Sequence, residues 1–344
     1  MPSKLDFGCL PTVIGSMPHT DPGEACNMLL RHLPAVPAWP QLPKRSFTES
    51  MYVQFSEGLP GLSVNIQEEQ IYIDRSGDLD PGLEALFEAA AKDDVSAFAI
   101  SRGSAAGLHA FLDSPNRPTV AAKGQITGPI SLGLSLTDGT YYVVYDDTLA
   151  EAIATHLRLK ASWQEKSLSR KSSKVIMFVD EPYLTSLGTS FVALPWETVA
   201  ALLEETLRGI SQIRGLHCCG RADWSLLLSL PIDILSFDTY NYTDSLGLYA
   251  ADARSFLNRG GCVAWGIVPN DEEALANETV ASLRDRLEEA MSPIAREGAR
   301  FSQIVEQALL TPSCGMPSLS VDAAETALEL LAGVSQNMRQ RYCL

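Results

Sequence analysis

The stretch GLHCCG at Gly215–Gly220 places three potential metal ligands in a row, directly before a glycine that permits a tight turn. The flanking segments have the spacing of amphipathic helices, so the stretch itself is most simply a short β-strand. Side chains alternate between the two faces of a strand, so His217 and Cys219 point one way and Cys218 the other. His-x-Cys at a strand end is therefore a two-ligand half-site for a soft divalent metal, above all zinc.

Two later segments offer further groups for the same site. Ile234–Asp238 is an apolar run that ends in a carboxylate, and Leu310–Met316 breaks into a turn that carries Cys314. Strand ends converge on one face of a parallel barrel. His217, Cys219 and Cys314 would then form a Cys₂His site with one open position, the pattern of catalytic zinc. The alternative is that these cysteines are ordinary buried core residues.

The alternation of strand-like and helical segments predicts the fold. Lys174–Val179 and Cys262–Val268 have the character of buried strands, and Leu149–Leu168 and Val321–Arg339 that of helices. With short links throughout, this order is typical of an α/β protein built as a (β/α)₈ barrel of the TIM type. We expect one such domain over residues 1–344. Neither a Gly-x-Gly-x-x-Gly motif after a strand nor a Walker loop is present, which disfavours a nucleotide-binding sheet.

The N-terminal part departs from this regular pattern. The first strand is expected at Pro11–Ser16, but the helical period disappears over Pro34–Leu79, where the chain alternates like a hairpin near its end. We expect residues 34–79 to be an insertion that lies over one end of the barrel, with Trp39 lining a site beneath it. A surface insertion without a role is an equally open alternative. Farther on, Glu272–Glu297 is expected to be one helix.

Composition excludes several classes of function. The 344 residues carry a net charge of −16, which argues against binding to nucleic acid or to anionic membranes. Met1–Leu10 lacks the apolar core of a signal peptide, and no apolar run is long enough to span a bilayer. Seven thinly spread cysteines do not form a disulfide framework, so we expect a cytoplasmic protein.

Taken in order, the motifs resemble the catalytic C-terminal barrel of cobalamin-independent methionine synthase, within the uroporphyrinogen decarboxylase–methionine synthase-like superfamily. His-x-Cys, a carboxylate at the end of the next strand and a distant Cys-Gly belong to this pattern. So do Thr12–Ser16, Thr127–Pro129 and Asp180–Pro182. The order of the motifs is more specific than any one of them, and the resemblance spans residues 11–316.

The resemblance implies roles for two residues near the metal ligands. It makes Asp238 the exchangeable fourth ligand of zinc, displaced when the substrate sulfur binds. The family has glutamate at this place, so the shorter Asp238 could instead act behind the ligands or cap a helix. It places Asp180, with Glu181, at the amino group of homocysteine, where a carboxylate can also move protons.

The resemblance further makes Ser16 the contact to the substrate carboxylate. Local turn chemistry is the alternative for Ser16, Asp180 and Glu181. Two positions depart from the family. Val53 stands where a second acidic contact to the substrate amine is expected, and Val268 stands where the family has a histidine.

A zinc-dependent methyltransferase follows as the expected function. Zinc deprotonates a thiol whose pKa is otherwise roughly 8.5 and leaves its sulfur electron-rich, which suits attack on a methyl carbon. The acceptor would be a zinc-bound small thiol, homocysteine first. The donor would be a methyl-corrinoid protein or a simple methylated carrier, because the chain is too short for the family's duplicated N-terminal half, which helps bind polyglutamated folate.

Three alternatives belong to other classes. One is a corrinoid-protein-linked methyltransferase that acts on another thiol. Another is a barrel like uroporphyrinogen decarboxylase, without methyl transfer, but the N-terminal segment lacks the arginines that such an enzyme uses for its polyanionic substrate. The third is a non-catalytic zinc-binding or methyl-carrier protein, which would have no need of an open coordination position.

Overall fold

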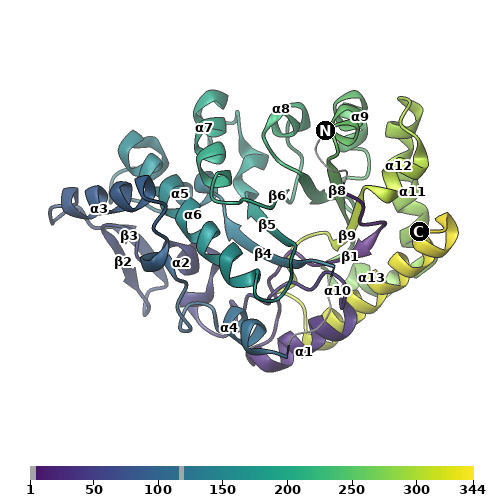
Figure 1. The fold of residues 1–344 in the computed structure, drawn as a ribbon, viewed down its shortest axis with the longest axis horizontal. Helices are drawn as coiled ribbons and strands as arrows, with labels where there is room; N and C mark the ends of the chain where they lie inside the picture. The colour runs from purple at the N-terminus through teal and green to yellow at the C-terminus, as the bar shows by residue number, and fades with distance from the viewer. Residues whose placement is uncertain (1–4, 116–119) are drawn as a thin grey trace.

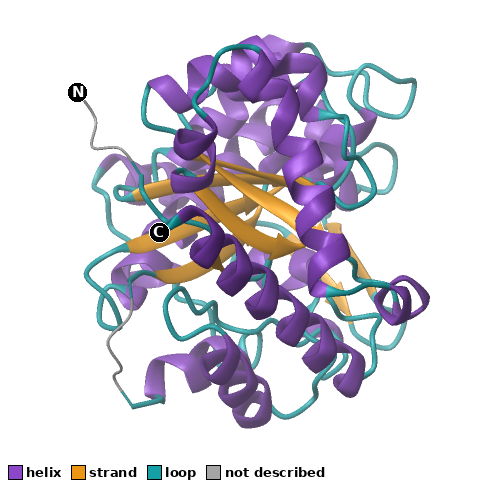
Figure 2. Cartoon of the chain, turned by 90° about the vertical axis from the view of Figure 1, so that its right-hand side faces the viewer, coloured by secondary structure: helices purple, strands orange, loops and turns teal. Residues whose placement is uncertain are grey.

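A curled, parallel β-sheet forms the centre of the molecule. The computed structural model describes residues 5–115 and 120–344, and in them seven strands pair in the order β1-β9-β8-β7-β6-β5-β4. Helices surround this sheet (Figures 1 and 2). The strands are β1 (Leu10–Pro11), β4 (Ala122–Thr127), β5 (Val175–Asp180), β6 (Ile213–Cys218), β7 (Ile234–Asp238), β8 (Cys262–Val268) and β9 (Ala308–Pro312).

The helices pack on the outer face of the sheet. The longest two are α6, which contacts β4 and β5, and α13, which contacts β1, β8 and β9. Among the helices of residues 5–115 and 120–344, none is both long and apolar enough to cross a membrane. They are α1 (Pro22–His32), α2 (Met51–Ser56), α3 (Asp80–Ala91), α4 (Ala106–Asp113), α5 (Pro129–Ser135), α6 (Asp147–Leu168), α7 (Trp196–Leu207), α8 (Trp224–Ser229), α9 (Ala250–Asn258), α10 (Glu272–Asn277), α11 (Val280–Arg296), α12 (Phe301–Glu306) and α13 (Val321–Tyr342).

The strands are apolar on both faces because both faces are buried. The outer face joins the helices in the main hydrophobic core. A separate buried cluster includes Ile176, Phe178, Ile213, Ile234 and Leu309, and none of its members comes from a helix. This second cluster therefore fills the inside of the curled sheet, as expected for parallel strands covered on both sides.

On β5 and β7, the inner row changes from apolar to polar side chains toward the carboxyl end of the strand. Because alternate residues share a face, Ile176 and Phe178 are followed by Asp180 on β5. On β7, Ile234 is followed in the same way by Ser236. In parallel α/β barrels the active site lies at the carboxyl ends of the strands. These polar residues therefore indicate where a functional site is expected.

A short extended segment connects the two edge strands of the sheet. Ala38 forms a parallel bridge with Lys123 of β4, and Gln41 forms one with Ser16, which follows β1. The buried Lys123 ammonium also donates to the Ile14 carbonyl at 2.6 Å, which ties β4 directly to the chain beyond β1. The predicted parallel α/β architecture is confirmed. The described residues give it seven regular strands in a curled sheet that is not fully closed, with isolated bridges between its edges.

The N-terminal region contains the predicted hairpin. It consists of β2 (Leu62–Asn65) and β3 (Gln70–Ile73), which pair antiparallel. The Ile73 amide donates to the Thr137 carbonyl, so the hairpin docks on the loop after α5. That residues 34–79 as a whole form an insertion covering one end of the sheet stays a prediction.

Two predicted element boundaries are wrong. The single helix expected over Glu272–Glu297 is interrupted, because Thr279 and Ser282 form a capping box that starts α11 afresh. The first strand ends earlier than expected: regular pairing with β9 stops at Pro11, and the chain at Ser16 pairs with Gln41 instead.

Gly215 tests the packing inside the sheet. A methyl group on this residue would overlap the Phe178 ring, which is itself fully buried. Gly215→Ala should lower the free energy of unfolding by about 2–3 kcal/mol, the usual cost of overpacking. Urea unfolding measures it, with Gly77→Ala as the control because that position has open space around it. Equal stability of the two variants would contradict this account of the interior.

Lys160 of α6 is a buried cation with a predictable effect on stability. Its side chain is almost fully buried, and burial lowers the pKa of its ammonium to about 8, against the attraction of Glu57. Below pH 8 the group is charged in the folded and the unfolded state alike, so the cost of burying the charge is present in full. Between about pH 8 and 10.5 the folded state has lost a proton that the unfolded state retains, and this cost is relieved.

Lys160→Met should therefore raise the free energy of unfolding at pH 7 by about 2 kcal/mol. The gain should shrink as the pH rises above 8. Urea unfolding of the variant and the wild type from pH 7 to 10 measures this trend. The control is Lys166→Met, an exposed position on the same helix, which should change stability little at any pH. A gain for Lys160→Met that does not depend on pH would contradict the explanation.

Candidate metal centre

Three potential ligands meet at the carboxyl ends of the strands. His217 lies near the end of β6, Cys219 is the first residue after β6, and Cys314 lies just after β9. One ligand atom from each lies within 4.8 Å of the others. β6 and β9 are not neighbours in the sheet, so the curl of the sheet brings these side chains together.

The His217 ring is held with one nitrogen directed away from the thiols. Its Nδ1 lies 3.0 Å from the Ser236 hydroxyl on the neighbouring strand β7. Its Nε2 is buried and has no hydrogen-bond partner among residues 5–115 and 120–344. A buried polar atom without a partner is costly. Metal-ligating histidines typically fix their other ring nitrogen through such a hydrogen bond, so Nε2 is the free ligand atom.

The two thiols act on each other and differ in acidity. The influence of Cys314, and after it that of His217, lowers the pKa of the Cys219 thiol despite its burial. The same contact raises the pKa of Cys314 well above its ordinary value. Cys219 is thus poised as a thiolate. One imidazole and two sulfurs within reach of one another form a donor set that fits zinc.

Cys218 has a different environment from its neighbour. It belongs to the main hydrophobic core on the outer face of the sheet, where burial raises the pKa of its thiol to about 12. The difference follows from the alternation of side chains along β6. Cys218 is therefore a core residue, and the ligand set draws on Cys219 instead.

Asp180 lies beside this cluster on the inner face. Its backbone pairs in register with His217, and its side chain is buried. In the part of the chain that the structure describes, its Oδ1 has no hydrogen-bond partner. Burial raises the pKa of Asp180 to about 6, against the attraction of the Lys123 ammonium. An inward carboxylate with a free oxygen can accept a hydrogen bond from a ligand's ammonium group.

Glu181 is committed to a different task. Its carboxylate accepts hydrogen bonds from the amides of Ile130 and Ser131 and from the Ser131 hydroxyl, at 2.6 to 2.9 Å. It therefore caps the first turn of α5, and Gly128 leaves the room for it, because a Cβ there would overlap this carboxylate. Burial raises its pKa to about 7. Its expected contact with a substrate amine stays a prediction.

Asp238 faces the cluster, but its oxygens have local partners. They accept hydrogen bonds from the amide and the side chain of Asn241 at 2.9 and 2.7 Å. Burial raises the pKa of the Asp238 carboxyl, and His217 and Cys219 also act on it, so it lies near them. Its carboxylate is outside the compact group of ligand atoms. Its coordination of a metal and its alternative place behind the ligands both stay predictions.

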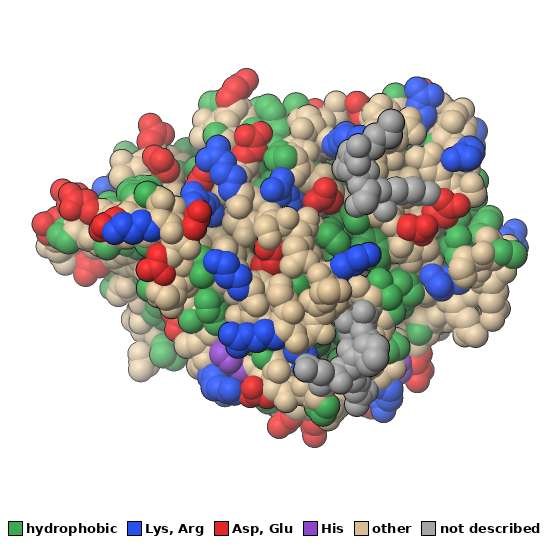
Figure 3. Space-filling model, in the orientation of Figure 1, with side chains coloured by type: hydrophobic (Ala, Val, Ile, Leu, Met, Phe, Trp, Pro, Cys, Tyr) green, Lys and Arg blue, Asp and Glu red, His purple; other side chains and the backbone are tan. Residues whose placement is uncertain are grey.

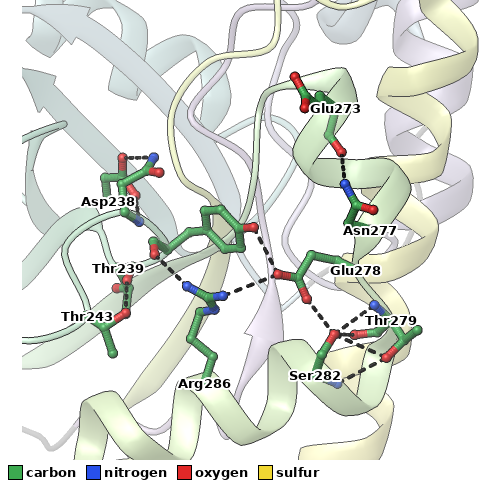
Figure 4. A network of polar contacts seen from close by, with 11 residues as sticks. Asp238, Thr239, Thr243, Glu273, Asn277, Glu278, Thr279, Ser282 and Arg286 are labelled. Atoms are coloured by element: carbon green, nitrogen blue, oxygen red, sulfur yellow. Dashed lines mark hydrogen bonds and ion pairs between the residues drawn. The ribbon is translucent and has the colours of Figure 1, made fainter.

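A polar network holds the loop after Asp238 in place (Figure 4). The Tyr240 hydroxyl donates to Glu278 at 2.9 Å, and the Arg286 guanidinium donates to the Tyr240 carbonyl and pairs with Glu278. Ser282 also donates to Glu278. The start of α11 therefore anchors the loop that positions Asp238.

The remaining predicted site residues lie in two environments. Ser16 is partly exposed and lies against Gly315, next to Cys314 in the chain. Trp39 is fully buried in the main core, and its indole donates to Gln164 of α6 at 2.8 Å. The structure thus brings Ser16 to the edge of the cluster and gives Trp39 a place in the packing against α6. That Trp39 lines a substrate site stays a prediction.

Two residues missed from the sequence contribute to the site. Ser236 orients His217, and it could have been found because it lies two positions before Asp238 on one face of a strand. Lys123 stands near Asp180, but a lysine inside an apolar run gives no local sign of its partner. The apolar positions Val53 and Val268 are both buried, so neither supplies a charge or a proton.

The comparisons with known proteins agree with this class of fold. No family model matches the sequence, and no curated protein matches it in sequence. Among solved structures, the fold is similar to that of a B12-independent methionine synthase from Shewanella sp. W3-18-1 in complex with selenomethionine. The TM-score is 0.59 and the identity 17%, over 98% of this chain and 99% of that chain. At this identity the likeness shows the fold alone.

Metal analysis tests the ligand set. After mild exposure to zinc and removal of excess, the protein should retain about one equivalent per chain, because the three donors are preorganised. Cys219→Ser and Cys314→Ser should each lose most of it. Cys218→Ser is the matched control and should keep it, since that thiol faces the outer core. Loss of zinc in Cys218→Ser together with retention in Cys219→Ser would refute the assignment.

Proposed function

We propose that this chain is a zinc-dependent methyltransferase that transfers a methyl group to the sulfur of a small thiol, with homocysteine as the leading acceptor. The observation that carries the proposal is the cluster of His217, Cys219 and Cys314 at the carboxyl ends of a parallel sheet, with a free, buried Nε2. Three protein ligands leave an open position, as in catalytic rather than structural zinc sites.

The chemistry divides between the metal and the chain. Zinc, when bound, would keep the acceptor sulfur as a thiolate at neutral pH. Ser236 orients the His217 ring. The free Oδ1 of Asp180 accepts a hydrogen bond from the ammonium group of the substrate thiol. Ser16, at the rim beside Gly315, contacts the acceptor's carboxylate. Holding both ends of the amino acid places its sulfur at the cluster.

The proposal includes a single domain of the (β/α)₈ type over residues 1–344. In it, the segment at Ala38–Gln41 takes the eighth place of the barrel, and most of the remainder of residues 34–79 covers the carboxyl ends of the strands. Tyr52 supports this cover: it stacks on Tyr183, which follows β5, with ring centroids 6.4 Å apart. Burial, Tyr183 and the nearby Cys219 all raise the pKa of the Tyr52 hydroxyl.

Selenomethionine in the similar solved structure supports an amino acid with a chalcogen side chain as the ligand here. The donor proposed from the sequence is a methyl-corrinoid protein or a simple methylated carrier. A barrel like uroporphyrinogen decarboxylase gives no reason for the cluster of two thiols and an imidazole.

Binding and turnover test the function together. Isothermal titration calorimetry should show homocysteine binding to the zinc-loaded protein and at least about tenfold weaker binding to the metal-free protein, since the sulfur loses its partner. With methylcobalamin or small methylated compounds as donors, mass spectrometry should detect methionine. Cys314→Ser should abolish it. Zinc and thiol binding without methylation from any donor would overturn the proposal and favour a binding role.

A further inference from the structure

A large cavity lies between the β2–β3 hairpin, α2 and the loop after α5. Its volume is about 810 Å³, within the usual range for small-molecule sites. Three aromatic rings line it: Phe47 precedes α2, Tyr52 lies in α2, and Tyr72 lies in β3. Rings from three separate positions around one cavity present several aromatic surfaces to a single ligand.

The charged groups of this cavity are mainly acidic. Glu69, Asp74 and Asp138 line it, against one cation, Arg75. The Arg75 guanidinium already pairs with Asp138 at 3.0 Å and with Asp146 at 2.6 Å, so its charge is largely neutralised. Acidic side chains also gather on the visible face at the end of the molecule formed by α3 and the hairpin (Figure 3). Together these charges favour a cation.

We propose that this cavity binds a methylated onium cation, either a quaternary ammonium or a sulfonium compound, and that this ligand is the methyl donor. The proposal rests on the methyl transfer proposed above. Such cations cannot donate strong hydrogen bonds, so proteins hold them against the electron-rich faces of aromatic rings. Phe47, Tyr52 and Tyr72 supply those rings, and the surplus of carboxylates supplies the charge.

Tyr52 connects the cavity with the surroundings of the metal centre. It lines the cavity, as Ser135 does. It also stacks on Tyr183, two residues after Glu181, and the charge of Cys219 acts on its hydroxyl. In this proposal, a ligand held against Tyr52 presents its methyl group on that side, toward the acceptor sulfur.

The transfer balances without a further reactant. The acceptor thiolate attacks the methyl carbon and forms a new carbon–sulfur bond. The bond between that methyl group and the onium nitrogen or sulfur breaks, and its electron pair stays on the departing atom, which leaves as a neutral amine or thioether. No proton is needed for this leaving group. The step therefore asks for no acid at the end of β8, where Val268 is apolar and buried.

Binding to the zinc-loaded full chain tests the cavity directly. Calorimetry with choline represents the ammonium compounds, and (2-hydroxyethyl)dimethylsulfonium represents the sulfonium compounds. The control ligand is 3,3-dimethylbutan-1-ol, which has the shape of choline without its positive charge. At least one cation should bind roughly tenfold more tightly than this isostere. Whichever cation binds more tightly identifies the class of donor.

Variants then assign the binding to the rings. Tyr72→Ala and Phe47→Leu should each lower the affinity for the preferred cation by about fivefold. Tyr141→Ala is the matched control, an exposed tyrosine of the neighbouring loop that does not line the cavity, and it should leave the affinity unchanged. Thermal unfolding of each variant checks that the protein is folded. If Phe47→Leu is unstable, Phe47→Tyr replaces it as the test: this variant keeps an aromatic ring and should retain cation binding.

The outcomes separate this inference from the proposed function. Equal binding of the cations and the isostere, or unchanged binding in both ring variants, would overturn the inference even if zinc and homocysteine bind as expected. Methylation of homocysteine by methylcobalamin but by neither cation would overturn the donor role and leave the methyltransferase intact. Methionine formed from the bound cation, and less of it at low donor concentration in Tyr72→Ala, would support the inference.

Discussion

In residues 5–115 and 120–344 no helix contributes to the buried cluster on the inner face of the parallel sheet, and this constraint shapes the rest of the molecule. A sheet that is apolar on both faces must bury both, so it curls until side chains from its own strands, Ile176 and Ile234 among them, pack against one another. Curling also brings the carboxyl ends of non-adjacent strands together. The cluster of His217, Cys219 and Cys314 is a consequence of that curl.

Around this cluster, buried polar groups hold one another in defined positions. The Ser236 hydroxyl is hydrogen-bonded to one ring nitrogen of His217, and Glu181 accepts hydrogen bonds from α5. Asn241 donates to both carboxylate oxygens of Asp238. Satisfied groups of this kind are rigid, because each would lose a hydrogen bond by moving. Two of the buried atoms that have no partner among the described residues belong to this region: Nε2 of His217 and Oδ1 of Asp180. They are the atoms best placed to meet a metal and a ligand.

Much of the architecture could be predicted from the sequence, because the signals involved are local. Strand and helix alternate with clear periodicity, so the parallel α/β class follows without knowledge of any long-range contact. The break between α10 and α11 also has a local signal, the capping box of Thr279 and Ser282. The sequence pattern does not predict this break, because the helical spacing of apolar residues continues on both sides of it. The isolated bridges of Ala38 and Gln41 have no regular sequence pattern, and only the folded chain reveals them.

The sequence by itself determined that His217 and Cys219 share one face of a strand and that Cys218 faces the other way, because this alternation is a property of the strand backbone. The tertiary structure decided which groups meet them. Cys314 lies after β9 and Ser236 on β7, both distant from β6 in the sequence. The Glu181 carboxylate accepts hydrogen bonds from the start of α5, and Trp39 packs against α6. Such meetings depend on how far the sheet curls and where each helix docks. Those are set by packing across the whole molecule, and no short stretch of residues contains that information.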